Sequence, residues 1–243
     1  MKIDMSEKMI ENYLKRNNFP ELKPKAVFFD MDGVLFDSMP KHSVAWERAM
    51  NESGLPFTRE QAYMFEGQPG ADTVNHVFSK IHGRESTEEE RIGIYTLKSQ
   101  YFDEQGEPEP MPYSLEILKK LKERGYMLFV VTGSGHPTLI GNIQAYFPGI
   151  FEAENIVTAF DVKRGKPFPD PYLKALTIAG IEPWEAVVVE NAPLGVKSSS
   201  TAKIYTIGVN TGPLDKSLLS NNGADIVLDS MQELYEKWNQ LGF

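Results

Sequence analysis

Residues 26–38 read AVFFDMDGVLFDS, an apolar run that ends in two carboxylates, Asp30 and Asp32. A short run of bulky apolar residues is typical of a strand that is buried on both faces of a parallel sheet. In open α/β sheets, ligands bind at the carboxyl ends of the strands. We therefore predict a strand over residues 26–29 that delivers both carboxylates to a functional site. A calcium-binding loop also contains Asp-x-Asp, but here the glycine arrives two positions too early for that loop.

Similar apolar runs recur along the chain and alternate with helical patterns, which favours a doubly wound parallel α/β sheet. We predict the further strands at residues 127–131, 156–158, 186–189, 204–207 and 226–228. This α/β core is expected to comprise residues 25–39 and 109–243.

Residues 40–108 interrupt this alternation, because they carry helical periodicity without a convincing strand. The pairs Thr58/Gln61 and Thr87/Glu90 have the spacing of capping boxes, which mark helix starts. We therefore expect an inserted α-helical cap, defined here as residues 40–108.

The first 24 residues precede the core and are expected to form a helical extension. Met5, Met9, Tyr13 and Leu14 follow the spacing of one helix face, with charged residues between them. Two interpretations stay open for this segment, namely packing on the domain surface and binding to a partner.

The composition limits the classes of function. The chain has 243 residues, of which 41% are hydrophobic and 24% charged, with a formal net charge of −9 and no cysteine. A negative net charge argues against nucleic acid or an anionic membrane as a partner, because both attract basic surfaces. The absence of cysteine excludes disulfides, thiolate catalysis and Cys-rich zinc sites. No apolar run approaches the roughly 20 residues of a membrane span. We expect a cytoplasmic monomer.

Polar residues follow other predicted strands as well. Thr132 and Ser134 end the second strand in a glycine-rich turn that could cradle an anion or merely precede a helix. Lys166 is either a solvated lysine or a fixed positive charge at the same edge of the sheet. Glu190 and Asn191 end another strand and could bind a metal or cap the next helix. Together these residues supply carboxylates, hydroxyls, a cation and oxygen ligands.

This assembly resembles the haloacid dehalogenase superfamily, in particular its β-phosphoglucomutase-like branch with a helical cap. The resemblance covers the chain from about residue 25 to its end. It implies that Asp30 is the nucleophile that becomes phosphorylated, and that Asp32 protonates the leaving group and later activates water. It also implies that Thr132 and Lys166 bind the transferring phosphoryl group. We expect a neighbouring negative charge to raise the pKa of Asp32, which must carry a proton in the first half of the reaction.

By the same correspondence, the cofactor is Mg²⁺. The resemblance implies that it binds the Asp30 carboxylate, the Asp32 backbone carbonyl and Asn191, with Glu190 in support. Asn191 stands where many relatives have aspartate; its amide oxygen still suits magnesium but brings no charge.

The cap supplies the expected specificity. His42 and Lys98 resemble polar cap residues that face the site on closure, although each could instead be satisfied locally or solvated. His136 follows the glycine-rich turn and is expected to approach the substrate. The sugar-phosphate mutases of this branch have a similar cap loop but carry an arginine at the position of Gly70. In those mutases the arginine holds a second phosphate. Glu66 instead adds a negative charge to this loop.

These features favour a Mg²⁺-dependent hydrolase acting on a small phosphorylated metabolite or on pyrophosphate. The details resemble most closely the pyrophosphate-hydrolysing members, in which Glu66 could complete a metal site in the closed form. One alternative is a β-phosphoglucomutase. The other is a catalytically silent phosphosugar-binding protein.

Overall fold

The computed structural model describes residues 5–135 and 137–243 and contains a parallel sheet. Its six strands have the order β3-β2-β1-β4-β5-β6. In chain order the strands are β1 (Ala26–Phe29), β2 (Met127–Val131), β3 (Ile156–Val157), β4 (Ala186–Glu190), β5 (Tyr205–Val209) and β6 (Ile226–Leu228). The order reverses between β1 and β4, and a ligand crevice is expected at such a switch point. The predicted doubly wound α/β class is confirmed.

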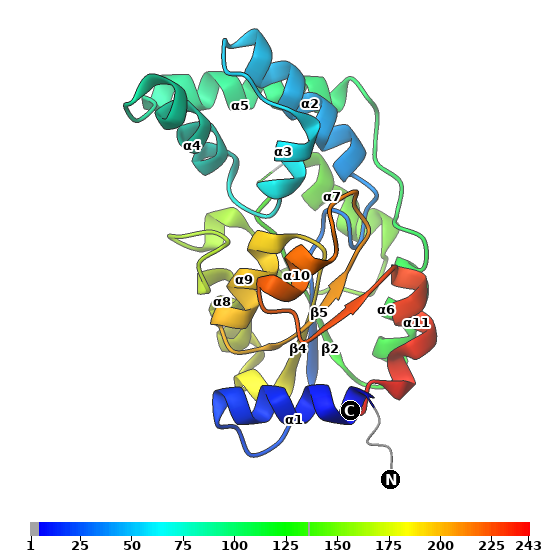
Figure 1. The fold of residues 1–243 in the computed structure, drawn as a ribbon. Coiled ribbons are helices and arrows are strands. Elements are labelled where there is room, and N and C mark those ends of the chain that lie inside the picture. The colour runs from blue at the N-terminus through cyan, green and yellow to red at the C-terminus, as the bar shows by residue number, and fades with distance from the viewer. Residues whose placement is uncertain (1–4, 136) are drawn as a thin grey trace.

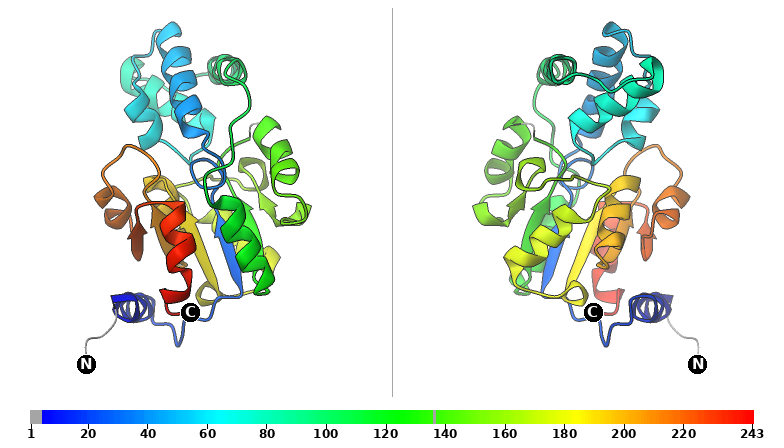
Figure 2. Two further views of the ribbon diagram at one scale, coloured as in Figure 1. Left: turned by 90° about the vertical axis from the view of Figure 1, so that its right-hand side faces the viewer. Right: turned by 90° about the vertical axis from the view of Figure 1, so that its left-hand side faces the viewer.

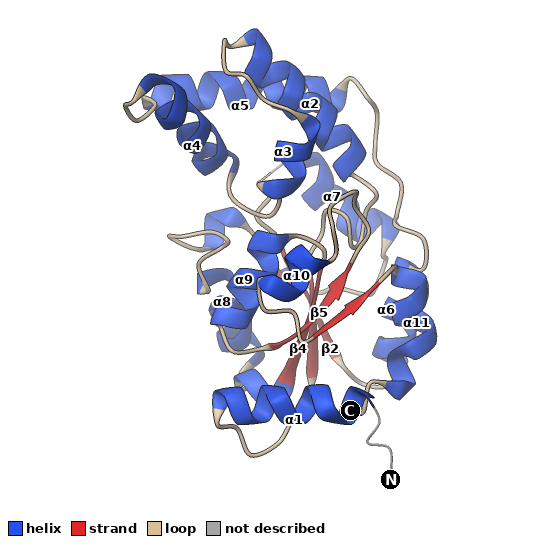
Figure 3. Ribbon diagram, in the orientation of Figure 1, coloured by secondary structure: helices blue, strands red, loops and turns tan. Residues whose placement is uncertain are grey.

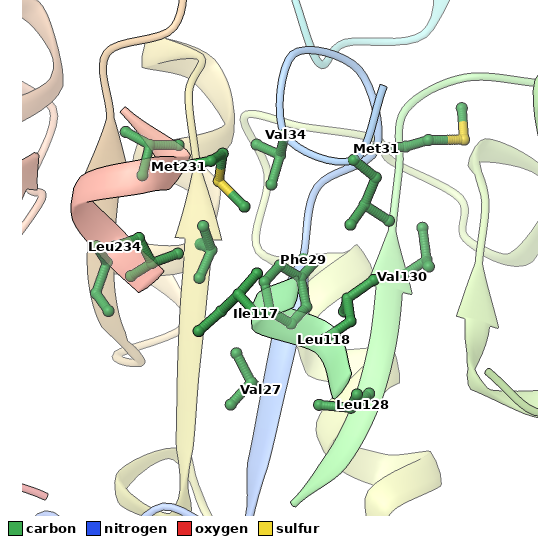
Figure 4. Packing of buried hydrophobic residues seen from close by; sticks show 14 of the residues in the cluster. Val27, Phe29, Met31, Val34, Ile117, Leu118, Leu128, Val130, Met231 and Leu234 are labelled. Atoms are coloured by element: carbon green, nitrogen blue, oxygen red, sulfur yellow. The ribbon is translucent and has the colours of Figure 1, made fainter. Parts of the chain in front are cut away.

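Helices cover both faces of the sheet because each strand presents alternate side chains to opposite sides. Val27 and Phe29 of β1 point into one apolar cluster (Figure 4), and Ala26 and Phe28 into the other. The first cluster includes residues of α6 (Ser114–Glu123), α7 (Pro137–Tyr146) and α11 (Met231–Lys237). The second includes residues of α8 (Asp170–Ala179), and α9 (Pro193–Thr201) and α10 (Ser217–Asn221) pack nearby.

No helix within the described residues is long and apolar enough to cross a membrane.

The bounds of three predicted strands are corrected by the structure. β5 runs from Tyr205 to Val209 rather than over 204–207, and β4 extends to Glu190, because Glu190 pairs with Gly208 and Val209 pairs with Leu228. β3 ends before Thr158 because the side chain of Thr158 accepts a hydrogen bond from the Phe160 amide and caps a 3₁₀ turn.

Four helices lie above the carboxyl ends of the strands (Figures 2 and 3). They are α2 (Met39–Glu52), α3 (Arg59–Met64), α4 (Gly70–His82) and α5 (Glu88–Asp103). The predicted capping boxes are present at the starts of α3 and α5. These helices enclose an apolar cluster of their own, which includes Trp46, Phe57 and Phe78. A separate cluster supports the proposed assignment of residues 40–108 to a cap domain.

At the opposite end of the sheet, α1 (Met5–Asn17) lies below the strands (Figure 1). The buried Tyr13 donates its hydroxyl to the Lys203 carbonyl at 2.9 Å, and its ring meets that of Tyr205 edge-on at 5.3 Å. Arg16 forms an ion pair with Asp225 at 3.0 Å. The described part of the N-terminal extension thus packs on the core, far from the cap.

We expect Tyr13→Ala to lower the free energy of unfolding by about 3–5 kcal/mol, because it removes a fully buried aromatic ring. Turnover per folded molecule should not change, because α1 and the cap lie at opposite ends of the sheet. Urea unfolding and phosphate release at low temperature measure the two effects. Glu11→Ala, at an exposed position of the same helix, is the matched control. A folded Tyr13→Ala variant without turnover would show that the extension influences the site.

Candidate active site

The two aspartates stand where β1 ends. The Asp30 amide donates to the Val189 carbonyl of β4 at 3.0 Å, so the strand pairing holds the position of Asp30. Gly33 then adopts a φ of +76°, a left-handed conformation that favours glycine, and its amide donates to the Phe36 carbonyl at 2.8 Å. This tight turn brings Phe36 beside Asp32, with which it forms an isolated bridge. Asp30 is only 2% exposed.

Lys166 connects three strand ends. Its buried Nζ donates to Asp30 Oδ1 at 2.6 Å, to Glu190 Oε1 at 2.6 Å and to the Val131 carbonyl at 2.9 Å. Burial alone would lower the pKa of Lys166, but Asp30 and Glu190 raise it above its ordinary value. The lysine is therefore a fixed positive charge beside Asp30, as one of the two sequence interpretations expected.

Glu190 organises its neighbours. Its Oε1 accepts from Lys166 and from the Tyr172 hydroxyl at 2.9 Å, and its Oε2 accepts from the amides of Asn191 at 3.0 Å and Ala192 at 3.1 Å. A Cβ at Gly195 would lie 1.8 Å from Glu190 Oε1, so only glycine lets α9 approach this carboxylate. Both carboxylate oxygens already have protein donors. Glu190 is therefore placed to orient Lys166 and the Asn191 turn.

Two oxygens at the same edge have no such donors. Asp30 Oδ2 and Asn191 Oδ1 are buried without a hydrogen-bond partner among the described residues. The Asn191 side-chain nitrogen donates to Glu66 Oε1 of the cap at 2.7 Å. Burial and the Glu190 carboxylate raise the pKa of Asp30 to about 8, and burial and Asp30 raise that of Glu66 well above its usual value. The site thus concentrates carboxylates that Lys166 alone does not neutralise.

Unpaired buried oxygens and excess negative charge fit a hard divalent cation such as Mg²⁺, which prefers oxygen ligands. Within residues 5–135 and 137–243, no group of three His, Asp or Glu side chains could hold a metal by itself. A cation here would therefore use amide and backbone oxygens together with the Asp30 carboxylate.

Asp32 faces the cap. Its Oδ1 accepts from the Ser38 hydroxyl at 2.6 Å and lies 3.2 Å from His42 Nε2, and Lys98 Nζ lies 2.8 Å from His42 Nδ1. A charged lysine can only donate, so His42 accepts at Nδ1 and donates to Asp32 from Nε2. The His42 ring also stacks on Phe102 with centroids 4.1 Å apart. The structure thus brings His42 and Lys98, distant in sequence, into one row that ends at Asp32.

The pKa of Asp32 differs from the sequence expectation. Burial alone would raise it, but His42 and Ser38 lower the pKa below its usual value, so the expectation of a raised pKa is wrong for this state of the protein. Burial lowers the pKa of Lys98 to about 8. Ser38 was missed as a site residue, although it ends the same stretch that carries both aspartates.

The glycine-rich turn follows β2. Thr132 is buried, and its Oγ1 accepts from the Ser134 amide at 2.9 Å. A Cβ at Gly133 would lie 1.8 Å from the carbonyl oxygen of Gly67, so a glycine is required where the cap loop touches the core. His136 lies outside the described residues.

A cavity of about 50 Å³ lies between cap and core at this point. The predicted site residues that line it are Asp30, Asp32, His42, Glu66, Lys98, Thr132 and Ser134. Lys166, Glu190 and Asn191 adjoin it through their contacts with Asp30 and Glu66. Core and cap residues therefore share one small, polar site.

Known proteins share this architecture. The profile of the haloacid dehalogenase-like hydrolases matches residues 27–209. A Bacteroides vulgatus protein, whose solved structure carries a provisional β-phosphoglucomutase name, is 48% identical with a TM-score of 0.94, covering 98% of this chain and 96% of that one. Hexitol phosphatase A of Escherichia coli is 31% identical over 225 residues, which cover 88% of this chain and 94% of the relative.

A more distant relative is pyrophosphatase PpaX of Oceanobacillus iheyensis, 24% identical over 86% of this chain and 94% of the relative. The profile match spans most of the chain and includes β1, β2 and β4, whose carboxyl ends meet at Lys166. The chain therefore belongs to the haloacid dehalogenase-like hydrolases and is an enzyme of their phosphatase or β-phosphoglucomutase-like kind.

Proposed function

We propose that this enzyme is a Mg²⁺-dependent phosphohydrolase of a compact phosphate compound, with inorganic pyrophosphate as the preferred substrate. The observation that carries the proposal is the contact between Asn191 and Glu66, in which the cap loop places a carboxylate at the core site, 2.7 Å from the amide nitrogen. A carboxylate repels a second phosphate group unless a cation lies between the two, so this carboxylate suits a cation that is shared with a small substrate. The 50 Å³ cavity, well below the roughly 300–1,000 Å³ of drug-sized ligand pockets, agrees with a compact substrate.

The proposed reaction has two halves. An oxygen of Asp30 attacks phosphorus while the bond from phosphorus to the leaving oxygen breaks, and Asp32 gives its proton to that oxygen. Water then attacks the phosphoaspartate, its proton passes to Asp32, and phosphate and free Asp30 are released. Lys166 and Thr132 hold the oxygens of the transferring group.

Asp32 needs a proton when the reaction starts, although His42 and Ser38 lower its pKa. The negative charge of the incoming substrate acts in the opposite direction and raises that pKa again. Lys98, His42 and Asp32 form a row. In this row the N–H of His42 Nε2 donates to the Asp32 carboxylate and so fixes its orientation.

Mg²⁺ would be held by the unpaired side-chain oxygens of Asp30 and Asn191 and by the Asp32 backbone carbonyl. Glu66 would supply a further oxygen ligand from the cap. When bound, the cation neutralises charge on the phosphoryl oxygens. Glu190 supports this set by orienting the turn that carries Asn191.

A β-phosphoglucomutase is the second candidate, which the name of the Bacteroides vulgatus relative favours. A mutase must hold two phosphates, and the arginine expected for the second one is replaced by Gly70. A Cβ at Gly70 would lie 2.1 Å from the Tyr95 ring, so a larger side chain has no room in this structure. The third candidate, a silent phosphosugar-binding protein, does not explain why Lys166 contacts the nucleophile Asp30.

The test compares Glu66→Ala with wild type on pyrophosphate and on 1-naphthyl phosphate, an ester too bulky for the 50 Å³ cavity. Loss of a charge-assisted contact costs about 1.5–3 kcal/mol, or about one to two orders of magnitude in rate. We expect kcat/KM to fall by that factor for pyrophosphate and much less for the ester, which reacts with the cap open. Glu60→Ala, at an exposed position of α3, is the matched control.

Equal losses on both substrates would contradict the role of Glu66. Conversion of β-glucose 1-phosphate to glucose 6-phosphate by wild type, faster than phosphate release, would establish the mutase instead.

A further inference from the structure

Two cavities meet at Tyr95. The 50 Å³ active-site cavity and a second cavity of about 370 Å³ are both lined by Gly70, Tyr95 and Gly133. The second cavity lies on the outer side, between α5 of the cap and the core segment near Phe160. Phe160 is 81% exposed and Ile92 is 58% exposed, so its walls include apolar side chains that face solvent. Tyr95 therefore stands between a small polar site and a larger, more apolar space.

The Tyr95 ring is fixed from several sides. Its Cε2 would lie 2.1 Å from a Cβ at position 70, so the ring occupies the space that a side chain at Gly70 would need. The Trp46 ring is tilted against it with centroids 6.0 Å apart, and Lys98 Nζ lies 5.6 Å from its centroid. Burial and the Asp32 carboxylate raise the pKa of Tyr95 to about 12, so its phenol stays neutral and adds no charge to the site.

We propose that Tyr95 determines the size of the substrate, because its ring closes the phosphoryl site toward the apolar cavity and restricts the leaving group to compact ones. The proposal rests on the phosphohydrolase function proposed above. It assigns to the 370 Å³ cavity the role of a leaving-group space that the wild type keeps separate. Removal of the ring would join the two spaces, whose larger part already falls in the size range of ligand pockets. An apolar, aromatic leaving group would then be buried against Ile92 and Phe160.

The experiment measures kcat/KM for acetyl phosphate, which is compact, and 1-naphthyl phosphate, which is bulky, in wild type and variants. The ratio between the two substrates is the readout, because the chemistry of each leaving group is the same in every variant and only its fit changes. We expect Tyr95→Ala to raise the ratio of 1-naphthyl to acetyl phosphate at least tenfold. Tyr95→Phe should leave the ratio within twofold of wild type, because it keeps the ring.

Three further variants complete the design. Tyr101 belongs to the same helix, α5, but lines neither cavity. Tyr101→Ala should therefore not change the ratio. Ile92→Asp in the Tyr95→Ala background places a charge in the apolar cavity and should cancel the gain. If the Tyr95→Ala variant does not fold, Tyr95→Leu is measured in its place.

A folded Tyr95→Ala or Tyr95→Leu variant with an unchanged ratio would overturn the proposal, and so would a gain that Ile92→Asp does not reduce. Neither substrate is pyrophosphate, so the result is separate from the proposed function. A wild type without preference for pyrophosphate would refute that function while the ratio still tests Tyr95.

Discussion

Asp30→Asn should lower turnover by at least about 10³-fold and leave the fold intact, because an amide cannot form the phosphoaspartate through which the proposed reaction proceeds. The asparagine is close to isosteric and keeps an oxygen for Lys166, which also donates to Glu190 and Val131. The amide also removes a carboxylate from a site that already concentrates negative charge. We therefore expect the circular dichroism and melting temperature of the variant, both measured without Mg²⁺, to stay close to those of wild type.

Phosphate release and acid-quenched mass spectrometry measure this prediction. Wild type should carry a phosphoryl group on the peptide that contains Asp30, and the variant should not. Asp229→Asn, an identical change at an exposed aspartate that pairs with Lys216, is the control and should behave as wild type. Turnover of Asp30→Asn within tenfold of wild type would contradict covalent catalysis by this residue.

Removal of divalent cations is expected to abolish turnover and to lower thermal stability. The physical reason is the pair of buried oxygens, Asp30 Oδ2 and Asn191 Oδ1, that have no hydrogen-bond partner among the described residues. A cation that binds only the folded state at 100 times its dissociation constant adds about 2.7 kcal/mol of stability. For a chain of this size that corresponds to a rise in melting temperature of about 5–10 °C.

Melting curves in excess chelator and in saturating Mg²⁺, at matched ionic strength, measure this shift without any substrate. Asn191→Leu should reduce the Mg²⁺-dependent rise, because it removes an oxygen ligand but fills a similar volume. The exposed change Asp229→Asn should keep the full rise. Full activity in excess chelator, or an equal rise in Asn191→Leu, would refute the assigned site.

The contacts of the core site were largely predictable. Asp30, Thr132 and Glu190 each follow or end an apolar run, and in a parallel sheet all such ends meet at the same edge. The sequence therefore indicated which residues would gather there before any side chain was placed. Lys166 was ambiguous in the sequence, because a lysine in a loop is usually solvated, and its contacts decided between the two interpretations.

The sequence by itself determined the α/β class, the strands and the aspartates at the end of β1, because strand periodicity and the parallel-sheet edge are local or repeating properties of the chain. Only the tertiary structure decided how the cap meets the core, since Glu66 and Asn191 lie 125 positions apart and Lys98 and His42 lie 56 apart. It also decided the direction of the Asp32 pKa shift and the position of the Tyr95 ring. These depend on distances between side chains that no local pattern encodes, because they are set by the packing of one group of helices against the edge of the sheet.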